Sequence, residues 1–252
     1  MIKKIVIIGS GNVATRFALE FKKVNIKILQ IISRNKNSGQ NLAKKVQALF
    51  STNFDDLIKS DLILICVNDD NIKLIVKKLP NLPMVHTSGN KSMSILDNRS
   101  NCGVIYPLQT LNKDDDVNFK TTPICIESNN SVFENDIFLL CRKISNKVCY
   151  LNSEKRKYLH LSAVIASNFS NFCYHIAKKQ LDDKNIDFEL IKPLILETAN
   201  KIFYTQPESS QTGPAARGDK RVIKEHLEML KDDNYKKIYK LLSESILKAY
   251  GK

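Results

Sequence analysis

The sequence begins with MIKKIVIIGSGNVA, residues 1–14, in which an apolar run leads directly into a glycine-rich turn. The run Ile5 to Ile8 is continuously apolar and β-branched, which predicts a strand buried on both faces of a parallel sheet. Gly9 permits a tight turn, and Gly11 lets the backbone approach a pyrophosphate at the N-terminus of the following helix. The dinucleotide-binding residues predicted in this turn are Gly9, Ser10, Gly11, Asn12 and Val13. The alternative is a glycine-rich turn in another α/β fold.

The loop after a second apolar strand, residues 28–32, predicts which dinucleotide is bound. A site selective for NAD carries an Asp or Glu here that accepts from the ribose 2′-hydroxyl, and this loop has neither. Arg34 can stack on adenine and donate to a 2′-phosphate, so we expect NADP in preference to NAD. The alternative is an exposed basic loop of a lysine-rich protein. The candidate ligands in this loop are Ser33, Arg34, Asn35 and Lys36.

Apolar strands alternate with helical segments as far as residue 151, which predicts a doubly wound, parallel α/β sheet. After the first two strands, the others are expected at residues 48–50, 61–67, 84–88, 104–106, 123–127 and 147–151. In such sheets ligands lie beyond the carboxyl ends of the strands. That rule adds Val67, Asn68, Asp69, Thr87, Ser88 and Gly89 to the expected cofactor site. A carboxylate at 69 or 70 is expected to cap the next helix.

From Ser153 onward the pattern is helical, without a strand signal. We therefore expect two domains: a dinucleotide-binding domain at residues 1–151, and an all-helical substrate or dimerisation domain at residues 152–252. A long helix from Ser153 to about Leu181 carries more apolar residues than one face can hold. This predicts a helix buried all round at a domain or subunit junction, and hence a homodimer. Asp187 and Asp219 are expected to cap later helices.

Composition excludes several other classes of protein. The net charge of +13 would suit a nucleic-acid binder, but the lysines are spread along the chain and Trp is absent, so no nucleic-acid partner is expected. No apolar run approaches the roughly 18 residues that cross a bilayer, and no signal peptide precedes the first strand. We expect a cytoplasmic protein without a membrane partner. The six cysteines lack CxxC spacing and are expected to be reduced core thiols, with no metal site.

Three further features are candidates for a role in binding or catalysis. His86 ends a predicted strand, where it could orient a carbonyl or could equally be a core histidine with a satisfied hydrogen bond. The polar segment 206–219 could close over a cleft, with Arg217 binding a carboxylate or phosphate, or it could be a helix connection in which Arg217 pairs locally. Asn168 and Asn171 could hold a substrate, or could satisfy polar groups of neighbouring helices.

Five motifs carry a resemblance to a known family: GSGNVA (9–14), HTSG (86–89), YPLQT (106–110), LHLSAVIASNFSN (159–171) and QTGPAARGD (211–219). Over nearly its whole length the chain resembles Rossmann-like oxidoreductases whose C-terminal half is a domain of unknown function. The first half is similar to deazaflavin-dependent NADP oxidoreductases and pyrroline-5-carboxylate reductases, and the overall plan to the 6-phosphogluconate-dehydrogenase-like superfamily. The resemblance implies a nucleotide-dependent reductase or dehydrogenase with a helical dimerisation domain, and supplies no substrate.

The chain departs from some of these relatives at one position. The 3-hydroxyacid dehydrogenases and ketopantoate reductases carry a lysine four residues before an asparagine on the first long helix of the second domain. Here the residues at that spacing are Val164 before Asn168 and Ser167 before Asn171, so this general acid is missing. A proton would have to come from another side chain or from water. The candidate catalytic residues are His86, Tyr106, His160, Asn168, Asn171 and Arg217.

These observations predict an NADP-dependent oxidoreductase that moves hydride to or from a small carbonyl, imine or hydroxy compound. The alternative is a dinucleotide-binding sensor or scaffold that keeps the fold but has lost turnover, which the missing lysine makes credible.

Overall fold

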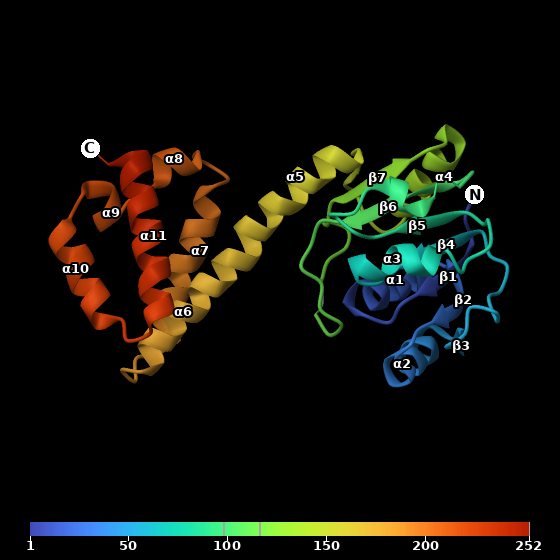
Figure 1. Cartoon of the computed structure of the whole chain (residues 1–252), viewed down its shortest axis with the longest axis horizontal. Helices are drawn as coiled ribbons and strands as arrows, with labels where there is room; N and C mark the ends of the chain where they lie inside the picture. The colour runs from blue at the N-terminus through green and yellow to red at the C-terminus, as the bar shows by residue number, and fades with distance from the viewer. Residues whose placement is uncertain (98, 116, 252) are drawn as a thin grey trace. The chain divides into compact units, whose positions relative to one another are not determined.

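The computed structural model describes residues 1–97, 99–115 and 117–251 (Figure 1). The chain forms two compact units, residues 1–167 and 168–252. The first unit is built on a β-sheet, and the described part of the second contains helices and loops only. The prediction that the second half of the chain is helical is therefore confirmed.

Eight strands of the first unit form one sheet in the order β3-β2-β1-β4-β5-β6-β7-β8, within the described residues. They are β1 (Lys4–Ile8), β2 (Lys27–Ile32), β3 (Leu49–Ser51), β4 (Leu62–Ile65), β5 (Met84–His86), β6 (Cys102–Pro107), β7 (Ile124–Ser128) and β8 (Val148–Tyr150). The first six are mutually parallel, and the order reverses between β1 and β4. The predicted doubly wound sheet is therefore confirmed.

The last two strands differ from the prediction of a parallel sheet. β7 is antiparallel to β6, and β8 is parallel to β7, so both run against the first six strands. A parallel neighbour needs a long crossover connection, commonly a helix, whereas an antiparallel neighbour does not. The residues described between 108 and 123 contain no helix, so β7 returns along β6 in the opposite direction.

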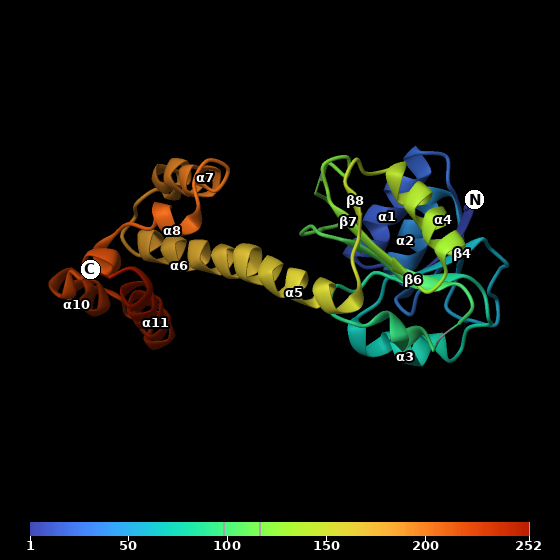
Figure 2. The ribbon, with the colours of Figure 1, turned by 90° about the horizontal axis from the view of Figure 1, so that it is seen from above.

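Helices cover both faces of the sheet (Figure 2). α1 (Asn12–Lys23), α2 (Lys36–Val46) and α4 (Ser131–Arg142) lie on one face, and α3 (Asp69–Val76) lies on the other with the 3₁₀ turn Met93–Leu96. Ile5 and Ile7 belong to the core under the three helices, whereas Val6 and Ile8 belong to the core on the α3 side. Burial on both faces explains why the first strand is apolar at every position.

The predicted long helix is present but is not uniform. α5 (Ser153–Ala163) continues into a π-helical segment, Val164–Phe169, and then into α6 (Ser170–Asp182). Leu161, Ile165 and Phe169 are 55%, 52% and 58% exposed in this chain. The expectation that the helix is buried all round is therefore wrong for the single chain. The remaining helices are 3₁₀ Phe188–Ile191, α7 (Lys192–Lys201), α8 (Pro207–Ser210), α9 (Pro214–Arg217), α10 (Lys220–Met229) and α11 (Asp233–Tyr250).

The predicted helix caps are only partly confirmed. Asp187 caps the 3₁₀ turn by accepting from the backbone N–H of Glu189, at 2.9 Å. Asn68, not an aspartate, occupies the N-cap of α3, and Asp69 and Asp70 lie in its first turn, where the helix dipole favours negative charge. Asp219 precedes α10, but among the described residues its carboxylate pairs with Arg217 and caps no helix.

The cysteines also divide into two groups. Cys66, Cys102, Cys125 and Cys141 are buried, as predicted, whereas the prediction of core thiols is wrong for Cys149 and Cys173, which are exposed. Within the described chain all six thiols are free, and no group of three His, Cys, Asp or Glu side chains could hold a metal ion. No described helix is both long and apolar enough to cross a membrane.

Candidate active site

The two glycines in the turn between β1 and α1 have different surroundings. Gly9 has φ +116°, and a Cβ there would lie 2.1 Å from the carbonyl oxygen of Cys66, so only glycine fits without a rearrangement. Gly11 is the N-cap of α1, and a Cβ there would meet no described atom within 4 Å. The end of α1 at Gly11 therefore borders open space, where a helix N-terminus can stabilise an anion.

A cleft of about 780 Å³ lies at the carboxyl ends of β1, β2 and β4. Of the predicted cofactor residues, it is lined by Gly9, Ser10, Gly11, Ser33, Arg34, Asn35, Val67 and Asn68. The structure places Asn12, Val13, Lys36, Asp69, Thr87, Ser88 and Gly89 outside this lining. The lining also includes Ser38, Phe54, Lys78 and Lys113, which the sequence patterns did not indicate. Only Ser38 carried a signal, because it lies three residues after Asn35, at the spacing of a helix cap.

Hydroxyl groups connect the two loops that border the cleft. Ser10 Oγ lies 2.7 Å from Ser33 Oγ and 2.6 Å from Ser38 Oγ. Asn35 caps α2 by accepting from the backbone N–H of Ser38 at 3.0 Å. These contacts fix the glycine turn against the loop after β2.

The charged side chains that line the cleft are all positive. Arg34 is exposed on the loop after β2, and Lys78 Nζ lies 5.9 Å from the ring centre of Phe54. Lys113 adds a third cation, and no Asp or Glu is found in the described lining. A cleft of this composition attracts anions such as phosphate groups.

Tyr106 and His160 form a second polar group, at the carboxyl end of β6. The Tyr106 hydroxyl lies 3.0 Å from His160 Nδ1, and the two rings meet edge to face with centroids 5.8 Å apart. Burial raises the pKa of the Tyr106 phenol to about 12, so the phenol keeps its proton at neutral pH. A Cβ at Gly89 would lie 2.8 Å from both rings, so the absence of a side chain there lets the backbone pack against the pair.

His86 is fully buried and differs from His160 in its electrostatics. Its Nδ1 accepts from the backbone N–H of Ser88 at 3.1 Å, and its Nε2 has no hydrogen-bond partner among the described residues. Burial lowers the pKa of His86 to about 3, and the positive charge of Arg156 acts in the same direction. The imidazole is therefore neutral at physiological pH.

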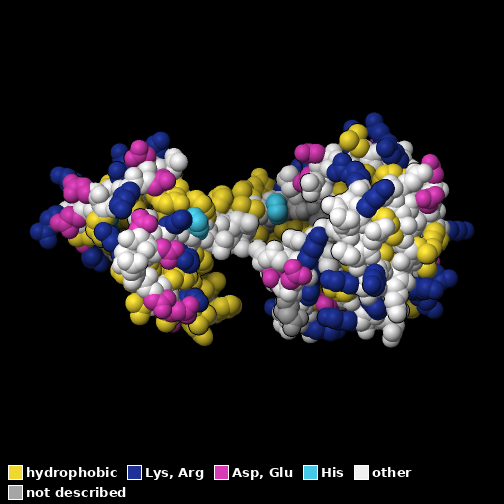
Figure 3. Space-filling view, turned by 90° about the horizontal axis from the view of Figure 1, so that it is seen from below, with side chains coloured by type: hydrophobic (Ala, Val, Ile, Leu, Met, Phe, Trp, Pro, Cys, Tyr) yellow, Lys and Arg dark blue, Asp and Glu magenta, His cyan; other side chains and the backbone are white. Residues whose placement is uncertain are grey.

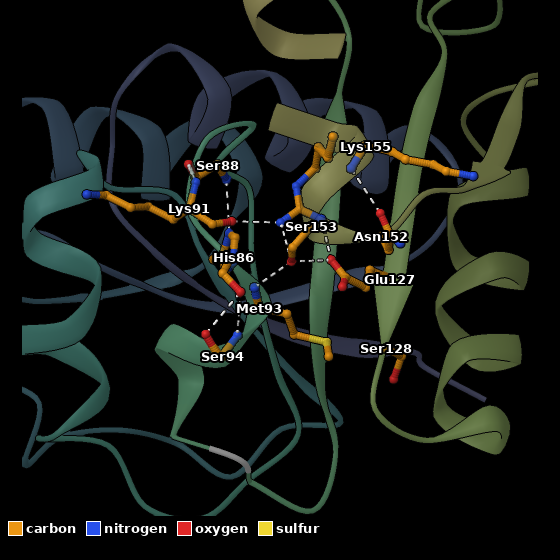
Figure 4. Close-up of polar contacts among 12 residues, drawn as sticks. His86, Ser88, Lys91, Met93, Ser94, Glu127, Ser128, Asn152, Ser153 and Lys155 are labelled. Carbon is orange, nitrogen blue, oxygen red and sulfur yellow. Dashed lines mark hydrogen bonds and ion pairs between the residues drawn. The ribbon is translucent and has the colours of Figure 1, made fainter. Parts of the chain in front are cut away.

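An ion pair connects β7 to the start of α5, and hydrogen bonds join the start of α5 to the loop after β5 (Figure 4). The Arg156 guanidinium pairs with Glu127 on β7 and donates to the Lys91 carbonyl oxygen at 2.7 Å. Ser153 donates to the same carboxylate at 2.7 Å and accepts from the backbone N–H of Met93 at 2.9 Å. These contacts hold Lys91 and Met93, in the loop after Gly89, against the start of α5. His160 lies one helical turn after Arg156, on the same side of α5.

The remaining candidates belong to the second unit. Asn168 lies in the π-helical segment and Asn171 in α6, and both are exposed. Arg217 ends α9, and its Nη2 lies 2.7 Å from the carboxylate of Asp219. The polar segment 206–219 contains the two short helices α8 and α9.

Comparisons with known proteins agree with this geometry. Residues 4–86 match the family described as "NADP oxidoreductase coenzyme F420-dependent", and residues 122–246 match "Domain of unknown function (DUF2520)". A crystal structure of a candidate NADP oxidoreductase from Bacteroides fragilis superposes with a TM-score of 0.91 at 36% identity, and covers 98% of both chains. The chain belongs to this family of NADP oxidoreductases.

Other solved structures share the fold of this oxidoreductase. A protein from Thermotoga maritima superposes with a TM-score of 0.77 at 26% identity, covering 96% of this chain and 99% of its own. An imine reductase from Myxococcus stipitatus, solved with NADP⁺, gives a TM-score of 0.68 at 13% identity, covering 97% of this chain and 92% of its own. A comparison with curated proteins finds no match. The predicted family, the α/β fold with its helical second half, and the NADP oxidoreductase class are confirmed.

Sequence patterns did not indicate Arg156, Glu127 or Ser153. Arg156 also bonds Ser153, three residues before it, but its partners Glu127 and Lys91 lie 29 and 65 residues away, so only the folded sheet brings these two to it. The spacing of Arg156 and His160, four residues apart on one helix, is the one available signal.

Proposed function

We propose that the oxidoreductase uses NADPH to reduce a small C=N or C=O compound, or catalyses the reverse reaction, with the Tyr106–His160 pair as its proton donor. The observation that carries the proposal is the 3.0 Å contact between Tyr106 and His160 Nδ1 at the carboxyl end of β6. Ligands of doubly wound sheets bind beyond such strand ends. The pair also offers a proton that the missing lysine cannot supply.

The residues of the cleft fit NADP. Gly11 leaves open space at the N-terminus of α1 for a pyrophosphate, and Arg34 can donate to the 2′-phosphate. Lys78 and Lys113 would add positive charge along the same cleft. When bound, NADPH supplies the hydride. The exclusively positive charge of the described lining supports NADP over NAD.

The protein's own contribution is to hold and move one proton. Tyr106 keeps its proton because its pKa is raised to about 12, so it can donate to an oxygen or nitrogen that gains negative charge. His160 Nδ1, 3.0 Å away, can return a proton to the phenolate. His86 is an inferior donor because its imidazole is buried and neutral. We propose that His86 supports the backbone turn at Ser88.

Imines and carbonyls are the first substrates to test. The fold relatives include an imine reductase from Myxococcus stipitatus and a reductive aminase from Aspergillus terreus, which superposes at a TM-score of 0.74 with 14% identity. Asn168, Asn171 and Arg217 remain proposed substrate ligands. For Arg217 this requires that a substrate carboxylate replace Asp219 as its partner.

The test is a screen of purified protein with NADPH against keto acids, imines and deazaflavin, following the loss of NADPH absorbance. Tyr106→Phe and His160→Asn should each lower kcat by about 10²–10⁴-fold, the usual contribution of a general acid, with NADPH affinity retained. The matched control is Tyr239→Phe, because Tyr239 and His226 form a similar pair, 2.7 Å apart, in the second unit. Full activity in both site variants would refute the assignment. NADPH binding without turnover of any compound would favour the sensor or scaffold alternative.

We also propose that the oxidoreductase is a homodimer joined through its helical unit. Large apolar side chains lie exposed on that unit, which is on the left in Figure 3. They include Leu190, Leu194, Leu196, Ile202 and Phe203. Exposed apolar patches of this kind mark protein interfaces.

A further inference from the structure

Two of the six cysteines lie side by side on neighbouring strands. Cys125 on β7 and Cys149 on β8 are opposite each other in the parallel register, and their Sγ atoms are 3.5 Å apart. Neighbouring strands lie about 4.8 Å apart, within the Cα separation of roughly 4.4–6.8 Å that a disulfide bridges. An S–S bond of about 2.05 Å therefore needs small side-chain rotations and no change in strand pairing.

Exposure assigns different roles to the two thiols. Cys149 is exposed, whereas Cys125 is 1% exposed. A reagent from solvent therefore meets Cys149 first, and Cys125 is the thiol held behind it. Cys173 is also exposed, but it lies on α6 in the second unit.

We propose that Cys125 and Cys149 form a dithiol site that is oxidised reversibly by low-molecular-weight disulfides. The Cys149 thiolate attacks the small disulfide, its S–S bond breaks, and one small thiolate leaves and takes up a proton. Cys125 then attacks the Cys149 sulfur of the mixed disulfide and expels the second small thiolate. In total, the two protein thiols lose two electrons and two protons, and the small disulfide is reduced to two thiols.

The second step is expected to be the slower one. Burial raises the pKa of the Cys125 thiol to about 12, and its contact with Cys149 acts in the same direction. Little thiolate is therefore present at neutral pH, and the reaction depends on the short distance between the two sulfurs.

The dithiol site adjoins the Tyr106–His160 pair. Cys125 is directly opposite Tyr106 in the β6–β7 register, and both belong to one apolar cluster that includes Leu159, next to His160. A disulfide at Cys125 therefore changes the packing against Tyr106. An effect of this change on catalysis rests on the proposed function, whereas the thiol chemistry and the packing change do not.

The test treats the reduced protein, residues 1–252, with oxidised glutathione and follows the products by intact mass and peptide mapping. We expect a loss of about 2 Da and a peptide that links Cys125 to Cys149, both reversed by dithiothreitol. Cys149→Ser should abolish the link, and Cys173→Ser, which removes the other exposed thiol, should leave it intact. Cys125→Ala should trap a glutathione adduct on Cys149.

A glutathione adduct that persists on Cys149 of the unaltered protein, a link to any other cysteine, or no reaction would overturn the proposal. No cofactor or substrate is present, so the result is independent of the proposed reaction. The effect of the disulfide on the packing of the Tyr106–His160 pair is measured by NMR. The His160 ring signals should shift on oxidation of the unaltered protein and not in Cys149→Ser; unchanged signals in a protein with the disulfide formed would refute this effect.

Discussion

At the scale of single residues, the expected preference for NADP depends mainly on Arg34. Replacing Arg34 by Ala should weaken NADPH binding by about 1.5–3 kcal/mol, the range for a hydrogen bond to a charged group, and leave NADH binding nearly unchanged. Calorimetric titration with both cofactors measures the difference. Lys27→Ala is the matched control, because it removes one positive charge from the opposite end of β2. Equal affinities for the two cofactors in the unaltered protein would contradict the prediction.

His86 makes a separate prediction about stability. Its pKa is lowered to about 3 in the folded protein, against about 6.5 when unfolded, so the unfolded chain binds the extra proton between these values. The stability due to its neutral form is complete above about pH 6.5 and is lost as the pH falls toward 3. Between pH 7 and pH 5 the loss should be about 2 kcal/mol.

Urea unfolding of the unaltered protein and of His86→Asn at these two pH values measures this contribution. The variant should lose less stability on acidification, whatever its absolute stability at pH 7. His175→Asn, at an exposed position on α6, is the control and should resemble the unaltered protein. Identical pH dependence in His86→Asn and the unaltered protein would show that His86 is not held neutral.

At the scale of elements, the two glycines of the turn between β1 and α1 are expected to serve different purposes: Gly9 allows the turn to fold, and Gly11 leaves room for the ligand. Gly9→Ala should destabilise the protein by about 3 kcal/mol or more, because it combines a positive φ with a clash against Cys66. Gly11→Ala has room in the described structure and an ordinary φ of −77°, so its stability should change by less than about 1 kcal/mol.

The same Gly11→Ala variant should nevertheless bind NADPH at least about tenfold more weakly, because the new methyl group occupies space that the pyrophosphate needs. Thermal unfolding and calorimetric titration of the two variants measure both effects. Unchanged NADPH affinity in a stable Gly11→Ala protein would show that the pyrophosphate does not bind at this turn.

Sequence patterns predicted this turn because a positive φ and a close approach restrict the residue type at Gly9 directly. They did not predict the reversed direction of β7 and β8, since alternation and β-branching show that a strand exists and not which way it runs. They also missed the cofactor-cleft lysines Lys78 and Lys113, which have no distinguishing pattern in a lysine-rich chain. The pairing of Arg156 with Glu127 needed the folded sheet, because those residues are far apart in sequence.

At the scale of the whole molecule, the exposed apolar side chains of the helical unit should determine the oligomeric state. Burying one such side chain contributes about 1.5–3 kcal/mol, and a micromolar dimer needs about 8 kcal/mol in all. Phe203 and Leu194 are 77% and 66% exposed in the single chain. Replacing both by Glu removes that contribution at two positions in each protomer and would place four negative charges in the interface of the dimer.

Light scattering at micromolar concentration should therefore give twice the 28.7 kDa of one chain for the unaltered protein and a single chain mass for the double variant. Val132 on α4 is equally exposed, at 74%, but lies in the first unit, so Val132→Glu is the control and should remain dimeric. A folded, monomeric unaltered protein would contradict the proposed homodimer. A dimer that survives in the double variant but is lost in Val132→Glu would move the interface to the first unit.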